Sequence, residues 1–277
     1  MFKRLLIACL VIGGALGCES DYTYFSDDVV GRYSRDNRFA RALKGVQNDT
    51  QVMALLATCE RPNAVDIGGY TLLELAAERG QKEAVEKLFE KGADPAKQVP
   101  LKYAKDLAMA QLLHKHNAAG IGELLGRCIG AGRFRIHDRT VEEIKEDRLL
   151  ALWALRNGAS ASASKNDGFS SSPIICEAIK WGDLFSVIMF LRGHADLKDV
   201  GDSLWQSPVL YAWYCRGGGA NHQIIHEAVW AAAHGNYPDS NYSIEDYIKM
   251  GISEESAKAI YATMQEIAAL EKELPGE

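Results

Sequence analysis

The sequence predicts an all-α protein built from repeated helical hairpins. Two stretches, residues 69–94 and 173–196, share one pattern: an apolar segment of helical length, a glycine, a second apolar segment and a closing Ala-Asp pair. Corresponding positions in the two stretches, Thr71 and Pro173, are 102 residues apart, which is three repeats of 34. Such a period is typical of solenoids, because a single hairpin cannot bury its apolar side and must stack on its neighbours.

The two clear copies carry small residues and glycines where a hairpin needs them. The first reads Gly69-Tyr70-Thr71-Leu72-Leu73-Glu74-Leu75-Ala76-Ala77-Glu78-Arg79-Gly80 and continues through Val85, Leu88, Phe89 and Gly92-Ala93-Asp94. The second holds Ile175, Ala178, Gly182-Asp183, Val187, Phe190-Leu191 and His194-Ala195-Asp196. Alanines let neighbouring helices approach closely, and Gly80 and Gly182 suit helix ends, where glycine adopts a left-handed backbone without strain.

This pattern resembles the ankyrin repeat, with the consensus G-x-T-P-L-H-x-A-A-x-x-G, a second helix with V-x-x-L-L and a closing G-A-D. Leu72 and Glu74 depart from it, at the proline and at the histidine. The resemblance implies an ankyrin-repeat solenoid of about six helical hairpins over residues 37–235.

Weaker copies account for the rest of that range. A short repeat closes at Leu112-Leu113 and Asn117-Ala118-Ala119, and a long one at Leu152 to Leu155 and Gly158-Ala159-Ser160. A degenerate first repeat holds Ala42-Leu43, Asn48-Asp49, Val52 and Leu55-Leu56, and a last one opens at Ser207-Pro208-Val209-Leu210-Tyr211-Ala212. Gly92 and Gly158 are 66 residues apart, so the short and the long repeat together are nearly as long as two repeats of 34.

Residues 236–277 are predicted to form a helical C-terminal cap. Ser243 can cap a short helix that ends at Gly251, and Ser253 can cap a longer one. In the longer helix an apolar stripe runs at helical spacing through Ala257, Ile260, Tyr261, Met264 and Ile267. We expect this stripe to pack against the stack, and a dimerising helix is the alternative.

The chain starts with a segment typical of secretion signals, residues 1–17. A positively charged start precedes an apolar run of about 12 residues, which is shorter than the roughly 20 needed to cross a bilayer. The junction Ala15-Leu16-Gly17-Cys18 resembles the bacterial lipoprotein signal, although that family prefers leucine where Ala15 stands. The resemblance implies a lipid on Cys18 and a place in the periplasm, with Glu19 favouring the outer membrane. An ordinary signal peptide with a chance cysteine is the alternative.

Residues 18–36 either tether the fold to the membrane or form an N-terminal cap, and the sequence leaves both open. This stretch is rich in acidic and aromatic residues, namely Glu19, Asp21, Tyr22, Tyr24, Phe25, Asp27, Asp28, Tyr33 and Asp36. The whole chain has a formal charge of −6, which becomes −8 when the signal takes Lys3 and Arg4 with it. Nucleic acid is therefore not an expected partner, because proteins that bind it are basic.

The sequence holds no catalytic signature: no G-x-S-x-G elbow, no phosphate-binding glycine loop and no H-E-x-x-H motif. We therefore expect no enzyme activity, no metal and no cofactor. The one cluster that resembles a metal site is His222, His226, Glu227 and His234, and a metal-dependent hydrolase built on His222 and His226 is the alternative. We expect buried thiols, with disulfides left open, at Cys59, Cys128, Cys176 and Cys215.

Ankyrin proteins hold a partner against their turn tips and the exposed ends of their first helices, so the resemblance implies partner-binding positions. These are Ile67, Tyr70, Glu78 and Arg79 in the second repeat, Lys180 and Trp181 in the fifth, and Ser203, Leu204, Gln206 and Tyr214 in the last. Trp181 and Tyr214 come first, because large aromatic side chains supply most of the energy in protein interfaces. The stretch 205–247 is rich in tryptophan and tyrosine, which is more often core than interface but favours the C-terminal half.

These features predict a protein that binds another protein and performs no chemistry. In architecture the chain resembles the lipoprotein immunity proteins that bacteria keep in the periplasm against toxins delivered by type VI secretion. That resemblance implies an inhibitor that sterically blocks a toxic effector enzyme, such as a phospholipase, and the acidic charge would steer a basic toxin toward it. An envelope scaffold or stress-protection factor that docks a resident protein is the alternative.

Overall fold

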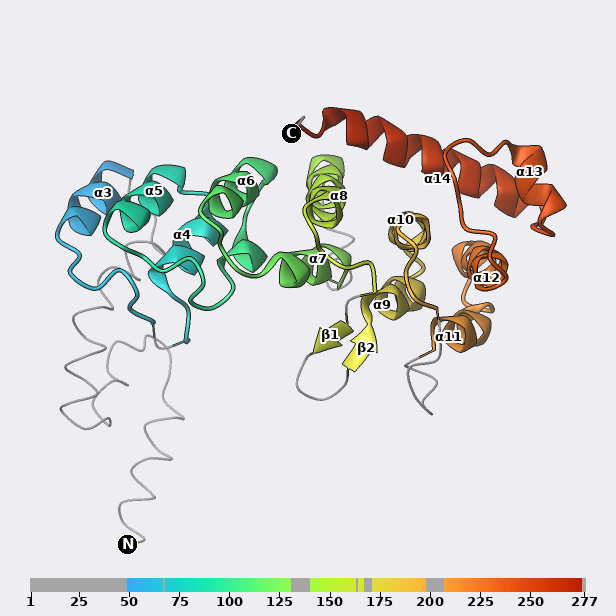
Figure 1. Cartoon of the computed structure of the whole chain (residues 1–277), viewed down its shortest axis with the longest axis horizontal. Coiled ribbons are helices and arrows are strands. Elements are labelled where there is room, and N and C mark those ends of the chain that lie inside the picture. The colour runs from blue at the N-terminus through green and yellow to red at the C-terminus, as the bar shows by residue number, and fades with distance from the viewer. Residues whose placement is uncertain are drawn as a thin grey trace, which may run out of the picture. The chain divides into compact units, whose positions relative to one another are not determined.

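The computed structural model contains helices in both of the compact units into which the chain divides, residues 1–97 and 98–277. The described residues are 49–66, 68–130, 140–162, 164–166, 171–197 and 207–275. Within them the predicted all-α class is confirmed (Figure 1). The only strands in these ranges are β1 (Ser164–Asn166) and β2 (Ser171–Pro173), which form one short antiparallel hairpin.

The amino-terminal predictions lie outside the described residues. They concern the signal peptide, the lipid on Cys18, the stretch 18–36 and the start of the first repeat at Ala42-Leu43. In the part of the chain that is described, no helix is both long enough and apolar enough to cross a membrane.

The first unit contains α3 (Asp49–Ala57), α4 (Leu72–Arg79) and α5 (Lys82–Glu90), and α5 packs against both of the others. A capping box fixes the start of α4. The Thr71 hydroxyl accepts a hydrogen bond from the Glu74 N–H at 3.2 Å, and the Glu74 carboxylate accepts one from the Thr71 N–H at 2.8 Å. Glu74 is buried, so the glutamate that departs from the ankyrin consensus has a structural role at this helix start.

A left-handed glycine makes the tight turn inside two hairpins. As predicted, α4 ends at Gly80 with a φ of 72°, and α9 (Ile174–Trp181) ends at Gly182 with a φ of 66°. In both turns the glycine N–H donates to the carbonyl three residues back, and the next N–H donates to the carbonyl five residues back from itself. The second helix of each hairpin, α5 or α10 (Leu184–Arg192), then begins. Two hairpins 102 residues apart therefore share one hydrogen-bond pattern.

Four helices, α5, α6 (Leu107–Lys115), α8 (Val141–Arg156) and α10, end in the same way: a residue with a left-handed backbone precedes a buried alanine. The left-handed residues are Gly92, Asn117, Gly158 and His194. The N–H of the following alanine reaches the carbonyl five residues back: Ala93 to Leu88, Ala118 to Leu113, Ala159 to Ala154 and Ala195 to Phe190. This is the Schellman motif, and the helix ends before Ala118 and Ala159 lie where the sequence predicts them.

Most helices of the second unit lie in two rows (Figure 1). One row holds α7 (Ile121–Gly130), α9 and α11 (Pro208–Cys215), and the other holds α8 (Val141–Arg156), α10 and α12 (Ala220–Ala233). Each helix of the first row packs on the helix that follows it in the chain, and α9 also packs on both α7 and α11. The 3-10 turn η1 (Pro100–Tyr103) and α6 (Leu107–Lys115) precede the rows, with η1 against α6 and α7.

The C-terminal helices α13 (Ile244–Lys249) and α14 (Glu254–Glu273) start where the sequence predicts. Ser243 and Ser253 cap them, each accepting a hydrogen bond from the N–H three residues on. Gly251 between the helices is left-handed, with a φ of 85°. The apolar stripe of α14 is buried apart from the half-buried Tyr261, so the interpretation of the stripe as a packing face is confirmed.

α14 contacts more of the fold than the last hairpin, α11 and α12. α14 crosses α8, α10 and α12 and contacts all three (Figure 1). Three of its glutamates pair with cations of α8 and α10: Glu266 with Arg148, Glu271 with Arg192 at 2.6 Å, and Glu273 with Lys145 at 2.7 Å. The spacing of the stripe predicts a buried face, but it does not predict which helices that face meets.

We expect Gly182→Ala to lower the free energy of unfolding by about 1 to 3 kcal/mol, because alanine is strained in a left-handed turn. In addition, a Cβ at Gly182 would lie 2.9 Å from Cε1 of His222 on α12. Urea unfolding followed by circular dichroism measures the change. Gly122→Ala on α7, where an added Cβ meets nothing within 4 Å, is the matched control and should leave stability unchanged or raise it. Equal stability of the two variants would contradict the role given to the turn.

Candidate partner-binding surface

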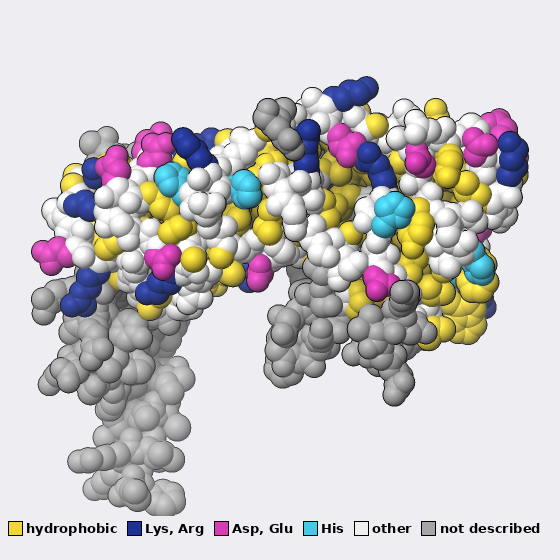
Figure 2. All heavy atoms as spheres, in the orientation of Figure 1, with side chains coloured by type: hydrophobic (Ala, Val, Ile, Leu, Met, Phe, Trp, Pro, Cys, Tyr) yellow, Lys and Arg dark blue, Asp and Glu magenta, His cyan; other side chains and the backbone are white. Residues whose placement is uncertain are grey.

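Large apolar side chains are exposed on one side of α11. Leu210, Trp213 and Tyr214 stand three and four residues apart, which places them on the same side of the helix, and their exposed fractions are 48, 50 and 64 %. On α12, Trp230 is 53 % exposed. Figure 2 shows hydrophobic side chains gathered over the region of α11. Contiguous exposed apolar area of this kind marks binding surfaces, because its contact with water is unfavourable.

The start of α11 is fixed by a cap. The buried Ser207 caps the helix by accepting a hydrogen bond from the Leu210 N–H at 3.2 Å, and Pro208 occupies the first turn, where a missing N–H is tolerated. α9 and α12 pack against α11 and leave one of its sides uncovered. Tyr211 is buried, and burial raises its pKa above the ordinary value, whereas Trp213 lies on the outer side.

Ring and cation contacts lie on both α11 and α12. The Arg216 guanidinium lies over the ring of Trp213, 4.6 Å from the ring centroid. The charge of Arg216 also acts on His226, whose ring stacks on Trp230 at 6.4 Å, and the ring centroid of His234 lies 4.8 Å from that of Trp230. The name α11–α12 strip is used below for Leu210, Trp213, Tyr214, Arg216, His226, Trp230 and His234.

The α11–α12 strip is cationic although the chain is acidic overall. No aspartate or glutamate occurs from Ser207 to His226, and Arg216 forms no ion pair with any described residue. The next carboxylate is Glu227, whose charge acts on His226. Burial by itself would raise the pKa of Glu227, but hydrogen bonds from Gln223 and Ser253 outweigh burial and hold this pKa below its usual value. The positive charge of the strip is therefore that of Arg216, which forms no ion pair among the described residues.

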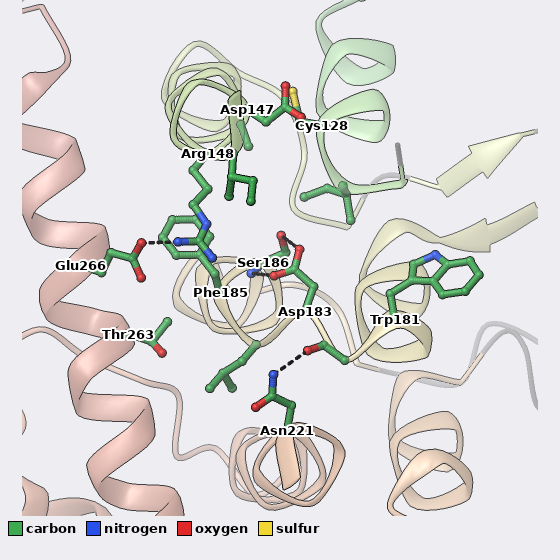
Figure 3. A pocket seen from close by; sticks show the side chains of 15 residues that line it. Cys128, Asp147, Arg148, Trp181, Asp183, Phe185, Ser186, Asn221, Thr263 and Glu266 are labelled. Atoms are coloured by element: carbon green, nitrogen blue, oxygen red, sulfur yellow. Dashed lines mark hydrogen bonds and ion pairs between the residues drawn. The ribbon is translucent and has the colours of Figure 1, made fainter. Parts of the chain in front are cut away.

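A hollow of about 490 Å³ opens where the α9–α10 turn meets α7, α8, α12 and α14 (Figure 3). The ring of Phe185 lines it, with the Arg148 guanidinium 4.3 Å from the ring centroid. Arg148 also pairs with Glu266 of α14. On the side of α12, the Asn221 amide donates a hydrogen bond to the Gly182 carbonyl at 3.1 Å.

Polar side chains of this hollow hold the fold together. Asp183 accepts hydrogen bonds from the N–H and the hydroxyl of Ser186 at 3.2 and 2.5 Å, which caps α10 (Figure 3). No histidine is among the described residues that line the hollow, so the Asp–Ser pair lacks the base that would activate a serine nucleophile. These side chains join the helices that line the hollow.

The predicted partner-binding residues near α4 differ in exposure. Glu78 and Arg79 are exposed at the end of α4. Tyr70 is half-buried beside Gly68, where an added Cβ would lie 3.0 Å from the tyrosine ring. Asp66 holds this turn by accepting hydrogen bonds from the N–H groups of Gly68 and Tyr70 at 2.8 and 2.9 Å. Ile67 lies outside the described residues.

Of the other predicted binding residues, one lines the hollow and one belongs to the strip. Trp181 is half-buried and lines the hollow, and its indole N–H donates to Glu177 at 3.2 Å. The Lys180 ammonium lies 4.7 Å from the Trp181 ring centroid. Tyr214 belongs to the strip. The three predicted residues Ser203, Leu204 and Gln206 lie outside the described residues.

Sequence reasoning missed Leu210, Trp213, Arg216 and Trp230. The prediction that the aromatic-rich stretch is mainly core holds for Tyr211 and Tyr247, which are buried, but not for these tryptophans. A signal was present, because residues 210, 213 and 214 form an apolar side at helical spacing. A helix that is apolar all round is normally buried all round, and the sequence does not reveal that one side of α11 stays uncovered.

The histidines that resemble a metal cluster have separate surroundings. His222 packs against Gly182 and Gly218, and its Nε2 is 3.4 Å from the Lys180 carbonyl. The Nδ1 of His234 is 2.7 Å from the Trp230 carbonyl. Across the described ranges, no three side chains of His, Cys, Asp or Glu gather closely enough to hold a metal ion. The alternative of a metal-dependent hydrolase therefore gains no support here.

The cysteines Cys59, Cys128, Cys176 and Cys215 are present as thiols and not as disulfides. The expected burial holds for Cys59 and Cys176, whereas Cys128 and Cys215 are half-buried. Burial raises the pKa of Cys176 to about 12, so this thiol is protonated and unreactive at neutral pH.

We expect His226 to make the chain less stable as the pH falls below about 6.5. Burial lowers the pKa of His226 below its ordinary value, and the charge of Arg216 adds to the effect. The folded chain therefore favours the neutral ring, so stability is full above the ordinary pKa and is lost as the pH falls toward the lower pKa of the folded chain. His226→Gln should lose less stability between pH 7 and pH 5, measured by urea midpoints. A slope equal to that of the unmodified chain would contradict this expectation.

Comparisons with known proteins provide no family for this chain. No protein-family model matches it, and no curated protein matches its sequence. Its function is therefore inferred from the residues and contacts described above.

Proposed function

We propose that the chain is a lipid-anchored protein-binding module that holds another protein on the α11–α12 strip and blocks it, as an immunity protein does. The observation that carries this proposal is the exposure of Leu210, Trp213 and Tyr214 on one side of a helix. Large side chains held on a regular helix need little further ordering when a partner binds, so more of the contact energy appears as affinity.

Ankyrin-repeat architecture over residues 37–235 is part of the proposal. It is supported by the two hairpins with one turn geometry and by the shared Schellman endings. Hydrogen bonds that span 34 residues add support: Lys91 to the Ala57 carbonyl, Lys97 to the Asn63 carbonyl, and the Asp196 N–H to the Ser162 hydroxyl. A period of 34 residues in contacts as well as in sequence is what stacked repeats require.

Blocking is the mode of action that fits a protein with no catalytic arrangement among its described residues. An enzyme whose active-site rim docks on the strip loses access to its substrate by steric exclusion. The formal charge of −6 favours rapid capture of a basic protein, because opposite net charges raise association rates. The partner we propose is a toxic effector, such as a phospholipase, that is met in the periplasm.

Trp213→Ala should weaken partner binding about tenfold or more, because truncating a central interface aromatic costs on the order of 2 kcal/mol. Tyr214→Ala should act in the same direction. Titration calorimetry with the protein encoded beside this chain's gene measures both effects. Ile248→Ala on α13 removes a comparably exposed apolar side chain and is the matched control, which should bind like the unmodified chain. Equal affinity of all three variants would mean that the strip is not the interface.

Survival of cells tests the inhibitor role directly. Cells that export the protein encoded beside this chain's gene, the proposed toxin, should survive when this chain is co-expressed. They should die when the co-expressed chain carries Trp213→Ala. Toxicity that persists with the unmodified chain would end the inhibitor proposal. A housekeeping protein recovered from unchallenged cells would favour the envelope scaffold instead.

Cys18→Ala should release the protein from the membrane fraction, because each buried methylene of an acyl chain contributes about 0.8 kcal/mol to anchorage. Cell fractionation, with mass spectrometry of the mature amino terminus, measures this. Cys9→Ala alters a cysteine that is lost with the signal, and it should leave anchorage unchanged. A Cys18→Ala protein that stays with the membrane would contradict the lipid anchor.

A further inference from the structure

The α11–α12 strip combines aromatic rings with one cation, Arg216, and none of its own residues is a carboxylate. Arg216 stacks on Trp213, and the rings of His226 and His234 flank Trp230. The chain as a whole carries 37 acidic and 31 basic residues, so this local composition is the reverse of the average. The segment that fits the strip therefore differs in charge from the protein that the net charge attracts.

Arg216 gives the strip a chemical preference. A guanidinium stacked on an indole ring keeps N–H donors at its edge, where one carboxylate can accept two of them. Among the described residues no carboxylate pairs with Arg216. Its charge and its donors are therefore free to engage a group outside the chain.

We infer that the α11–α12 strip docks an acidic and apolar segment of the partner protein, with a carboxylate on Arg216 and apolar side chains against Trp213 and Tyr214. This inference rests on the proposed function and names the partner's contacting segment. Charge selects this occupant, because a basic segment would bring like charge to Arg216. A purely apolar segment would exclude water from the guanidinium without replacing its hydrogen bonds.

Other occupants fit the strip less well. A second copy of this chain that docked through the same face would bring another strip without a carboxylate, so Arg216 would meet no anionic partner. An anionic membrane surface offers phosphate to Arg216 and an interface to the tryptophans, and it is distinguished by the experiment below.

An acidic contacting segment is compatible with a partner of basic net charge. Net charge governs the long-range encounter, whereas the charges at the contact govern docking and register. The formal charge of −6 attracts a basic protein, and the strip then determines which segment of that protein binds.

Two peptides test the inference: acetyl-Glu-Leu-Glu-Phe-Glu-Leu-Glu-amide and the same peptide with lysine at each glutamate. They are titrated into the full chain carrying Cys18→Ser, so that no acyl chain contributes. We expect the acidic peptide to bind about tenfold more tightly or better, because a charge-assisted bidentate contact is worth at least that factor. Arg216→Glu should abolish this preference. Lys115→Glu makes the same change of charge at an exposed residue of α6 and should preserve it.

Three results would overturn the inference. The first is equal binding of the two peptides, and the second is a preference for the acidic peptide that survives in Arg216→Glu. The third is tight, Arg216-dependent binding to phosphatidylcholine vesicles containing phosphatidylglycerol without binding of the acidic peptide, which would assign the strip to a membrane. Circular dichroism of Arg216→Glu should match that of the unmodified chain, because Arg216 is exposed.

The partner protein itself separates this inference from the proposed function. If Trp213→Ala loses the partner while Arg216→Glu keeps it, the strip is the interface but the contacting segment is not acidic. If both variants keep the partner, the proposed function fails as well. Loss of the partner in both variants, with binding retained in Lys115→Glu, is the outcome we expect.

Discussion

Two hairpins of this chain depend on a backbone that reverses direction within two residues. Between α4 and α5, and again between α9 and α10, a left-handed glycine makes this reversal, and the same two hydrogen bonds hold it. The turn brings two helices together side by side, and buried alanines such as Ala76 and Ala178 let them approach. The side-by-side placement of the two helices in each of these hairpins follows from this local geometry.

Local sequence determines where the helices end, and it does so because capping involves residues only a few positions apart. Ser243 and Ser253 cap the predicted helices, and Gly80 and Gly182 end theirs. The path of α14 is not local. Its residues Glu266 and Glu271 pair with arginines 118 and 79 residues away, and no spacing within the helix contains that information.

The candidate site could be predicted only in part, for a related reason. The position of Tyr214 follows from the repeat pattern, whereas the exposure of Trp213 depends on which sides of α11 are covered by α9 and α12. Periodicity reports that a side is apolar and does not report what lies against it. The contact between Arg216 and the ring of Trp213 could not be predicted from the sequence either. Arg216 follows the helix, so this contact depends on the path of the chain beyond Cys215.

The span of α14 has a consequence for the end of the stack. Repeats that touch only their neighbours open from the end inward, so a terminal hairpin is ordinarily the first to fray. In this chain the hairpin α11–α12 holds that position, and it also holds the strip. Since α14 bridges α8, α10 and α12, opening the last hairpin requires breaking contacts with the two before it. We therefore expect α14 to couple the opening of the last hairpin to that of the two before it, so that the surface of α11 and α12 is lost only when the helices beside it also open.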